Sequence, residues 1–444
     1  MKKRRILFVS LGCPKNQVDG ELMLAKLQNA GFENADNFER LDAVIVNTCA
    51  FIDSAKQEAI DTILEMVGLK KDGLVRAVIV TGCLAERYRD EILQEIPEVD
   101  AVVGIGANGD IDKIVDEVLD GKQTNVFPDK KELPMCGERV LTTPDYWAYL
   151  KIAEGCSNCC TYCAIPSIRG PFRSRDEESI VEEAKTLAEQ GVKELVLIAQ
   201  DVSSYGIDIY GEYRLAHLLD LLCEIDGIEW IRLHYAYPTA FPDEVIEVMA
   251  REPKICKYLD IPFQHISDDQ LAAMHRRHTK AQAYELIDKL RQAIPDLALR
   301  TTLLVGYPGE TEADFEELLE FVRTVRFERL GVFPYSEEEG TYSARNLPDD
   351  VPEEVKQSRV ERVMALQNEI SLENNRARIG QLERVIIDSR QGDFYVGRSQ
   401  YDSPEVDQEI LIPAAGRRLI RGCFYQVRIT AAEDYDLYGE LETK

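Results

Sequence analysis

Four cysteines fall within one short segment, "EGCSNCCTYCAIP" at residues 154–166. Two spacings can be read from them. Cys156, Cys160 and Cys163 form the pattern C-x3-C-x2-C, whereas Cys156, Cys159 and Cys163 form C-x2-C-x3-C. Closely spaced thiolates suit zinc or an iron–sulfur cluster. The segment therefore predicts a metal centre, and the spacing alone leaves both sets of ligands open.

The kind of metal follows from the surroundings of this segment in the sequence. A structural zinc site usually takes two separated pairs of ligands, and no partner pair follows at the zinc-ribbon spacing of about 12–20 residues. Three thiolates on a cubane cluster instead leave one iron open to a substrate or cofactor. The segment also follows the first strand of a βα series, where loops form the active face of a barrel. This position indicates that the metal takes part in chemistry.

Three more cysteines stand where predicted strands end: Cys13 in "SLGCPKNQ", Cys49 in "VNTCAF" and Cys83 in "VTGCLAE". Ligands of open parallel sheets bind beyond the carboxyl ends of the strands, so these thiols can converge on one edge. A strand-end cysteine can also be a small buried hydrophobic residue. Because all three occupy the same relative place in successive βα units, the pattern favours a shared site.

Two series of alternating strands and helices must position these residues. In the first, short β-branched runs alternate with amphipathic helices, which predicts a doubly wound parallel α/β domain. The second begins at Trp147 and fits a partial or complete TIM-like (β/α) barrel. The first series has expected strands at 6–10, 43–47, 76–82 and 99–106, and the second at 149–155, 194–201, 230–237, 258–263, 297–306 and 329–336. The helices expected between them include 84–95 in the first series and 177–189, 243–251 and 312–325 in the second.

The pattern changes after Gly380 to short strands separated by polar turns, "RVIIDSR", "FYVGRS", "EILIP" and "FYQVRIT". These predict a small all-β unit, an OB-like barrel. The expected organisation is an α/β domain at 1–122, a linker at 123–141, a barrel domain at 142–373 and a β-barrel domain at 374–444.

Composition limits the class of protein. The 444 residues carry a formal net charge of −28, which argues against a general affinity for nucleic acid or anionic lipid and suits a basic partner. No stretch approaches the about 20 apolar residues of a membrane span, and the apolar run near the start is too short for a signal peptide. Eleven cysteines, an odd number, indicate metal or redox chemistry rather than disulfides. We expect a cytoplasmic protein.

The segment "CSNCCTYC" resembles the radical S-adenosylmethionine (SAM) pattern C-x3-C-x-aromatic-C, with Tyr162 as the aromatic residue. The resemblance implies that Cys156, Cys160 and Cys163 hold a catalytic [4Fe–4S] cluster and that Cys159 does not. "TTLLVGYPGET" (301–311) resembles the strand and turn that lie along the bound cofactor in these barrels. The expected cofactor contacts are Tyr162, Gln200, Asp201, Gly306 and Glu310.

Nearly the whole chain resembles the radical SAM methylthiotransferases, in which the C-terminal β unit is called TRAM. This resemblance implies that Cys13, Cys49 and Cys83 hold a second [4Fe–4S] cluster, which supplies or presents the sulfur. It further implies that the first cluster cleaves SAM to a 5′-deoxyadenosyl radical and that a second SAM provides the methyl group. An electron donor such as a flavodoxin or ferredoxin is an expected partner.

The family has two main branches, one that modifies an adenosine in tRNA and one that modifies an aspartate of the small-subunit ribosomal protein numbered twelve. Stretches such as "LDIPFQHISD" and "YVGRSQYDSPEVD" resemble the second branch. Residues 376–444 hold 10 Lys plus Arg and 12 Asp plus Glu, whereas a tRNA-binding barrel should be basic. We therefore expect the basic ribosomal protein as substrate, without direct nucleic-acid binding, and keep the tRNA enzyme as the alternative. The expected substrate contacts are Asp402, Glu405 and Asp407.

Overall fold

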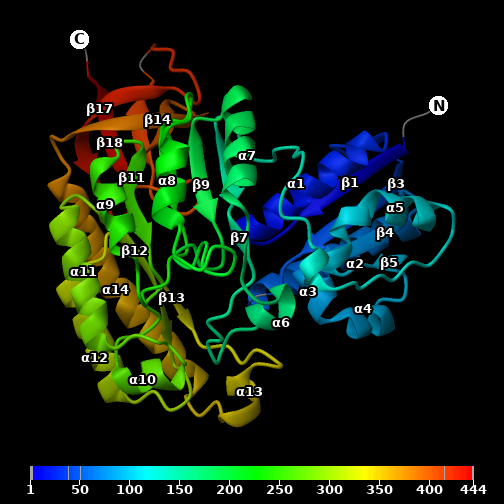
Figure 1. The fold of residues 1–444 in the computed structure, drawn as a ribbon, viewed down its shortest axis with the longest axis horizontal. Coiled ribbons are helices and arrows are strands. Elements are labelled where there is room, and N and C mark those ends of the chain that lie inside the picture. Colours follow the sequence, from blue (N-terminus) through cyan, green and yellow to red (C-terminus); the bar gives the residue numbers. More distant parts are fainter. Residues whose placement is uncertain (1–3, 39, 51, 415, 443–444) are drawn as a thin grey trace.

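The computed structural model describes residues 4–38, 40–50, 52–414 and 416–442, so the outer ends of the expected first and last domains (1–3 and 443–444) lie outside it. Three β-sheet units follow one another along the chain (Figure 1). Within the described ranges, no helix is both long and apolar enough to cross a membrane.

The first unit is a five-stranded parallel sheet between two layers of helices. Its elements are β1 (Arg4–Ser10), α1 (Pro14–Asn29), β2 (Phe32–Asn34), β3 (Leu41–Thr48), α2 (Asp53–Lys71), β4 (Val75–Gly82), α3 (Cys83–Arg87), α4 (Arg89–Glu95), β5 (Ala101–Val102), a 3-10 turn (Ile105–Asp110) and α5 (Ile111–Leu119). The strand order is β2-β1-β3-β4-β5. Helices α1 and α5 cover one face, and α2, α3 and α4 cover the other. This confirms the predicted doubly wound domain.

The central unit is a six-stranded parallel sheet with strand order β13-β12-β11-β10-β9-β6. Its strands are β6 (Trp147–Lys151), β9 (Glu194–Ile198), β10 (Trp230–Leu233), β11 (Ile255–Asp260), β12 (Ala298–Val305) and β13 (Arg329–Pro334). Its helices are α6 (Ile165–Arg169), α7 (Glu177–Glu189), α8 (Leu215–Cys223), α9 (Asp243–Arg251), α10 (Asp268–Ala273), α11 (Lys280–Ala293), α12 (Glu312–Val325), α13 (Tyr342–Asn346) and α14 (Glu353–Ala377). A two-stranded ribbon, β7 (Ala153–Glu154) and β8 (Arg173–Ser174), flanks α6. The barrel is thus open, with β6 and β13 at its edges.

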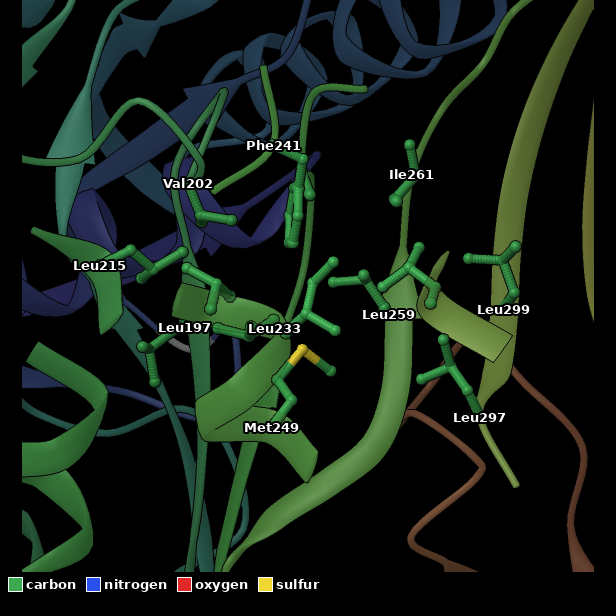
Figure 2. Packing of buried hydrophobic residues seen from close by; sticks show 14 of the residues in the cluster. Leu197, Val202, Leu215, Leu233, Phe241, Met249, Leu259, Ile261, Leu297 and Leu299 are labelled. Atoms are coloured by element: carbon green, nitrogen blue, oxygen red, sulfur yellow. The ribbon is translucent and has the colours of Figure 1, made fainter. Parts of the chain in front are cut away.

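The outer face of the barrel sheet holds the largest apolar core of the protein. Alternate residues of a strand point to the same face, and Leu197, Leu233 and Leu259 from three neighbouring strands pack towards the helices (Figure 2). Leu215 of α8 and Met249 of α9 belong to the same cluster. Burial of such side chains is worth about 1.5–3 kcal/mol each. This core fixes the strands whose ends carry the site.

The inner face of the barrel sheet is covered by the other two units. It carries bulkier side chains, including Trp147, Tyr149 and Tyr258. Val18 and Leu22 of α1 pack against this face from the first unit. The C-terminal unit contacts the same face through Ile386, Tyr401 and Phe424. The open barrel is therefore closed by its neighbours rather than by further strands.

The C-terminal unit is a closed five-stranded barrel that follows the long helix α14 (Figure 1). Its strands are β14 (Leu382–Gln391), β15 (Phe394–Ser399), β16 (Ile410–Pro413), β17 (Phe424–Ala432) and β18 (Leu437–Leu441). They close in the order β14-β15-β16-β18-β17 around an apolar core. This confirms the predicted OB-like unit.

Local differences from the sequence predictions have simple causes. The helix expected over 84–95 is divided at Tyr88, whose φ of −123° and ψ of 37° are not helical. The strand expected over 149–155 ends at Lys151 and continues as the short β7. The segment expected as a linker, 123–141, is anchored, because buried Arg139 forms ion pairs with Glu21 and Glu183.

Candidate active site

The segment with four cysteines forms a compact loop between β7 and α6. Gly155 opens it with a φ of +75°, and a side chain there would collide with neighbouring backbone, so only glycine fits. The Cys156 N–H donates to the Gly170 carbonyl at 3.1 Å, and the Cys163 N–H donates to the Cys160 carbonyl at 3.0 Å. The loop is thus shaped by its own backbone hydrogen bonds.

Three of its thiols lie close enough to perturb one another. Burial raises the pKa of Cys156 to about 11, and the neighbouring Cys160 adds to this shift. Burial also raises the pKa of Cys163 above its usual range, with contributions from Cys160 and Cys156. Cys159 is exposed, has a φ of +53° and is not among the main causes of either shift. These mutual effects relate Cys156, Cys160 and Cys163 to one another, whereas Cys159 is exposed.

Positive charge and a hydroxyl group face this group of thiols. Arg276 Nη1 lies 3.7 Å from the Cys160 sulfur, and the Tyr237 hydroxyl lies 4.0 Å from it. The Arg276 guanidinium also stacks over the Tyr237 ring at 4.2 Å. A buried guanidinium beside these thiols stabilises their deprotonated form, which is the form that binds metals.

Gln200 and Asp201, both predicted as cofactor contacts, hold the cysteine loop from the end of β9. Asp201 accepts a hydrogen bond from the Asn158 side chain at 2.9 Å and others from Ser203 and Ser204. Gln200 donates to Glu154 at 2.7 Å. Both carboxylate oxygens of Asp201 are therefore used within the protein, whereas the buried Gln200 Oε1 accepts no hydrogen bond from a described residue.

Tyr162, the aromatic residue of the motif, packs inward against the expected cofactor strand. Its ring meets that of Tyr307 edge to face at 6.3 Å, and the Tyr307 hydroxyl hydrogen-bonds to Thr161 at 2.7 Å. Met274 and Tyr335 belong to the same buried cluster. These contacts fasten the end of β12 to the cysteine loop. The segment expected to lie along the cofactor is therefore close to the expected cluster ligands.

Gly306 and Glu310 form the turn after β12. Gly306 has a φ of +72°, and a side chain there would collide with the stem of Lys356. Glu310 accepts the backbone N–H groups of Gly306 and Tyr307, and its other oxygen lies 3.2 Å from Arg359. Burial raises the pKa of Glu310 to about 7. The Glu310 carboxylate therefore holds the turn itself.

The second group consists of Cys13, Cys49 and Cys83, at the carboxyl ends of β1, β3 and β4. Gly12 has a φ of +93°, and a side chain there would lie 2.9 Å from the Cys49 sulfur, so the chain before Cys13 passes directly over Cys49. Burial raises the pKa of Cys83 to about 12, and Cys13 and Cys49 both add to this shift. The three sequence-distant thiols thus converge at one sheet edge.

A buried network of charges joins the two groups. Arg169, at the end of α6, donates to the Cys83 sulfur at 3.3 Å and to Asp19 at 2.6 Å. It also lies 3.2 Å from Glu154, and Lys151 bridges Asp19 and Glu154 at 2.5 and 3.1 Å. Sequence reasoning missed these residues. The available signal was charge within an apolar strand, as in "YLKIAEG".

The donor sets fit iron–sulfur clusters better than a single ion. Among the residues that the structure describes, no three His, Cys, Asp or Glu side chains close around one metal ion. A four-iron cluster binds one thiolate per iron, so its ligands stand farther apart than those of one ion. Each group offers three thiols, and arginines lie beside both. Three thiols are the number of protein ligands that a [4Fe–4S] cluster with one open iron would take.

The acidic residues expected to contact substrate differ in their surroundings. Asp402 is buried in ion pairs with Arg329 and Arg378, which hold its pKa down at about 2. Asp407 lies 2.7 Å from Arg300 with its side chain almost fully buried. These two carboxylates are therefore neutralised inside the protein, because loop 401–409 folds inward rather than outward.

Glu405 is the exposed member of that set. It has a φ of +65° and accepts a hydrogen bond from the Tyr149 hydroxyl at 3.4 Å. It lines a cavity of about 650 Å³ between the barrel sheet and the C-terminal unit, together with Glu409 and Asp436. Glu405 is thus the one residue of the three expected substrate contacts whose side chain is open to solvent.

Comparison with known proteins places each unit. Residues 150–322 match the radical SAM superfamily, residues 379–441 match the TRAM domain, and residues 5–104 match the uncharacterized protein family UPF0004. The fold and the site together therefore define a radical SAM enzyme, a SAM-dependent transferase whose superfamily implies a [4Fe–4S] cluster.

Curated relatives give the family. A ribosomal protein uS12 methylthiotransferase RimO of Christiangramia forsetii is 49% identical over 440 residues, which cover 99% of this chain and 95% of the relative. The RimO of Desulforamulus reducens is 50% identical over 440 residues, which cover 98% of each chain. The chain belongs to the RimO family.

Solved structures share the fold at low sequence identity. The radical SAM methyltransferase TsrM of Kitasatospora setae, determined with tryptophan and a SAM analogue, matches with a TM-score of 0.59 and 15% identity. The match covers 74% of this chain and 72% of TsrM. This likeness supports the architecture alone.

Proposed function

We propose that this protein adds a methylthio group to the β-carbon of an aspartate of ribosomal protein uS12, with SAM and two [4Fe–4S] clusters. The observation that carries the proposal is the pair of three-thiol groups, joined through Arg169 in one interior region. The names of the RimO relatives support uS12 as the substrate. A ribosomal protein substrate would place the enzyme in the cytoplasm.

In this proposal Cys156, Cys160 and Cys163 hold the first cluster. Cys13, Cys49 and Cys83 hold the second. When bound, the first cluster with SAM would supply radical chemistry able to break an unactivated C–H bond, and the second would supply or present the sulfur. A one-electron donor of the flavodoxin or ferredoxin type is required to reduce the first cluster.

The other side chains of the site hold these ligands in place. Asp201 fixes the cysteine loop through Asn158, and Glu310 fixes the turn along which SAM would lie. Tyr162 and Gly306 would border SAM, and Gln200 would offer its free Oε1. Bringing reactants into one fixed geometry can lower a barrier by several kcal/mol.

Substrate binding is assigned to the cavity beside the C-terminal unit. Glu405 and Glu409 are exposed there, and such carboxylates suit a basic protein, although arginines also line the cavity. Asp402 and Asp407 would act by positioning loop 401–409, because both are already paired with arginine.

The test is a reaction of the anaerobically reconstituted enzyme with SAM, a reductant and either uS12 or tRNA. We expect mass spectrometry to find a methylthio group on one aspartate of uS12 and none on tRNA. A methylthio group on tRNA adenosine would establish the alternative that the sequence leaves open. Modification of neither substrate would refute both.

A further inference from the structure

Lys15 is a buried lysine whose ammonium group meets no anion. It lies on α1, follows Cys13 by two positions and is 8% exposed. Its Nζ lies 3.3 Å from the centre of the Tyr235 ring. Across the described residues, the ammonium makes no hydrogen bond or ion pair, whereas buried Lys151 has two carboxylate partners. The cation–π contact holds the ammonium over the ring without neutralising its charge.

The position of Lys15 is defined by the segment after β10. Burial raises the pKa of Tyr235, while Lys15 lowers it and Cys13 raises it, so both groups lie near the Tyr235 hydroxyl. Two residues further on, the Tyr237 hydroxyl lies 4.0 Å from the Cys160 sulfur. One short segment therefore reaches from the second thiol group to the first, and Lys15 lies beside it.

Two acidic side chains of this region are paired with other groups. Asp260 accepts the Tyr235 N–H at 3.3 Å, and its other oxygen lies 3.8 Å from Arg300. Glu405 accepts the Tyr149 hydroxyl. Neither lies within 4.0 Å of the Lys15 ammonium, since no such ion pair is found in the described chain. Among the described residues, Lys15 therefore has no carboxylate partner within 4.0 Å.

We infer that Lys15 binds the side-chain carboxylate of the target aspartate and selects it against an amide. This inference rests on the proposed function. The β-carbon is one bond from that carboxylate, so an ammonium that holds the carboxylate also fixes the carbon to be modified. The position beside Cys13 would hold that carbon near the second thiol group, on the segment that leads to the first.

The test compares the affinity of the iron-loaded enzyme for uS12 and for uS12 in which the target aspartate is asparagine. We expect the wild-type chain to bind the aspartate form about tenfold more tightly, a difference of about 1.4 kcal/mol. Lys15→Met and Lys15→Gln should bind both forms equally. Lys26→Met is the matched control, because Lys26 lies on the same helix and is exposed, and it should keep the tenfold preference.

Each other outcome is decisive. A preference retained by either iron-loaded Lys15 variant would overturn the inference. Loss of the iron bound by Cys13, Cys49 and Cys83 in both Lys15 variants would also overturn the inference. Lys15 would then be needed to stabilise the second cluster rather than to bind the substrate. If the wild-type chain binds neither form of uS12, it is the proposed function that fails.

Discussion

The guanidinium of Arg169 donates a hydrogen bond to the sulfur of Cys83 at 3.3 Å. Arg169 ends the helix that begins just after Cys163, so one side chain links the first ligand loop to a ligand of the second group. Its other nitrogen pairs with Asp19 and Glu154, which lie on α1 and β7. The two thiol groups are thereby held at a fixed separation by buried charge.

Replacing Arg169 should therefore affect both stability and the second cluster. Arg169→Ala leaves buried Asp19 without one of its two cations, and breaking a buried ion pair costs about 3–5 kcal/mol. Urea unfolding measures this loss. Exposed Arg323→Ala, which removes a surface pair with Glu320, should change the free energy of unfolding by about 1 kcal/mol or less. Equal effects of the two substitutions would contradict the role given to Arg169.

The reduction potential of the second cluster gives a separate test of the contact between Arg169 and Cys83. In a chain that lacks Cys156, Cys160 and Cys163, only the second group can bind iron. A hydrogen bond and a positive charge favour the more negative, reduced cluster. Adding Arg169→Ala should move the midpoint potential of that cluster in the negative direction, as followed by electron paramagnetic resonance during a redox titration. An unchanged potential would mean that Arg169 acts on packing alone.

Iron and sulfide analysis tests the assignment of the second group. The anaerobically reconstituted Cys13→Ala chain should lose about half of the iron, since each group is expected to hold one four-iron cluster. Retention of all the iron would remove Cys13 from the ligand set. Exposed Cys136→Ala is the matched control and should keep the wild-type iron content.

The register of the cysteine loop has its own test. Cys160→Ala should abolish formation of 5′-deoxyadenosine from SAM, because Cys160 lies among the grouped thiols beside Arg276. Cys159→Ala should leave that activity intact, because Cys159 is exposed and stands apart. The opposite result would select the spacing C-x2-C-x3-C.

Substitutions of Asp402 and Glu405 should have different effects, the first on the stability of the fold and the second on substrate binding. Asp402→Ala leaves Arg329 and Arg378 buried without their shared carboxylate and should lower the free energy of unfolding by about 3–5 kcal/mol. Glu405→Gln should leave the unfolding transition unchanged and weaken uS12 binding. Calorimetric titration with uS12 measures the second effect. Weaker binding by a folded Asp402→Ala chain, with none for Glu405→Gln, would reverse these roles.

His265 should make the fold sensitive to acid. Its Nδ1 accepts the Ser267 N–H at 3.0 Å, and burial lowers the pKa of His265 to about 4, against 6.5 for the free side chain. Between these pH values the unfolded chain binds a proton that the folded chain does not, so the free energy of unfolding falls as the pH falls. The full loss is about 3 kcal/mol.

Urea unfolding at successive pH values measures this slope. His265→Gln cannot titrate and should reduce the slope between pH 6.5 and 4. Part of the slope should remain, because burial also lowers the pKa values of His234 and His278. A His265→Gln profile as steep as the wild type would assign the acid sensitivity to other groups.

Local pattern was sufficient to predict most of the fold. The helices expected at 177–189, 243–251 and 312–325 have those bounds in the structure, because each has a clear apolar period and a defined start. The convergence of Cys13, Cys49 and Cys83 followed from the rule for strand ends. The helix bounds depend on residues that are close in sequence. The convergence of the cysteines depends on a βα unit that is repeated along the chain.

Ion pairs between distant residues could not be predicted in this way. Lys151 and Asp19 are 132 positions apart, and Asp402 and Arg329 are 73 apart. Acidic residues are usually exposed, so residue type favoured a surface role for Asp402 that its burial does not support. Only the packing of three domains reveals which charges are neutralised.

Helix α1 has a consequence for the synthesis of the chain. Met23 and Leu27 pack beneath the first sheet, whereas Val18 and Leu22 pack on the inner face of the barrel. The first domain is translated before β6 is made. Val18 and Leu22 therefore remain exposed to water until the barrel has been synthesised and has folded. During this interval the nascent chain exposes these apolar side chains and the Asp19 carboxylate, which is buried in the complete fold. Exposed apolar surface of this kind favours binding by chaperones.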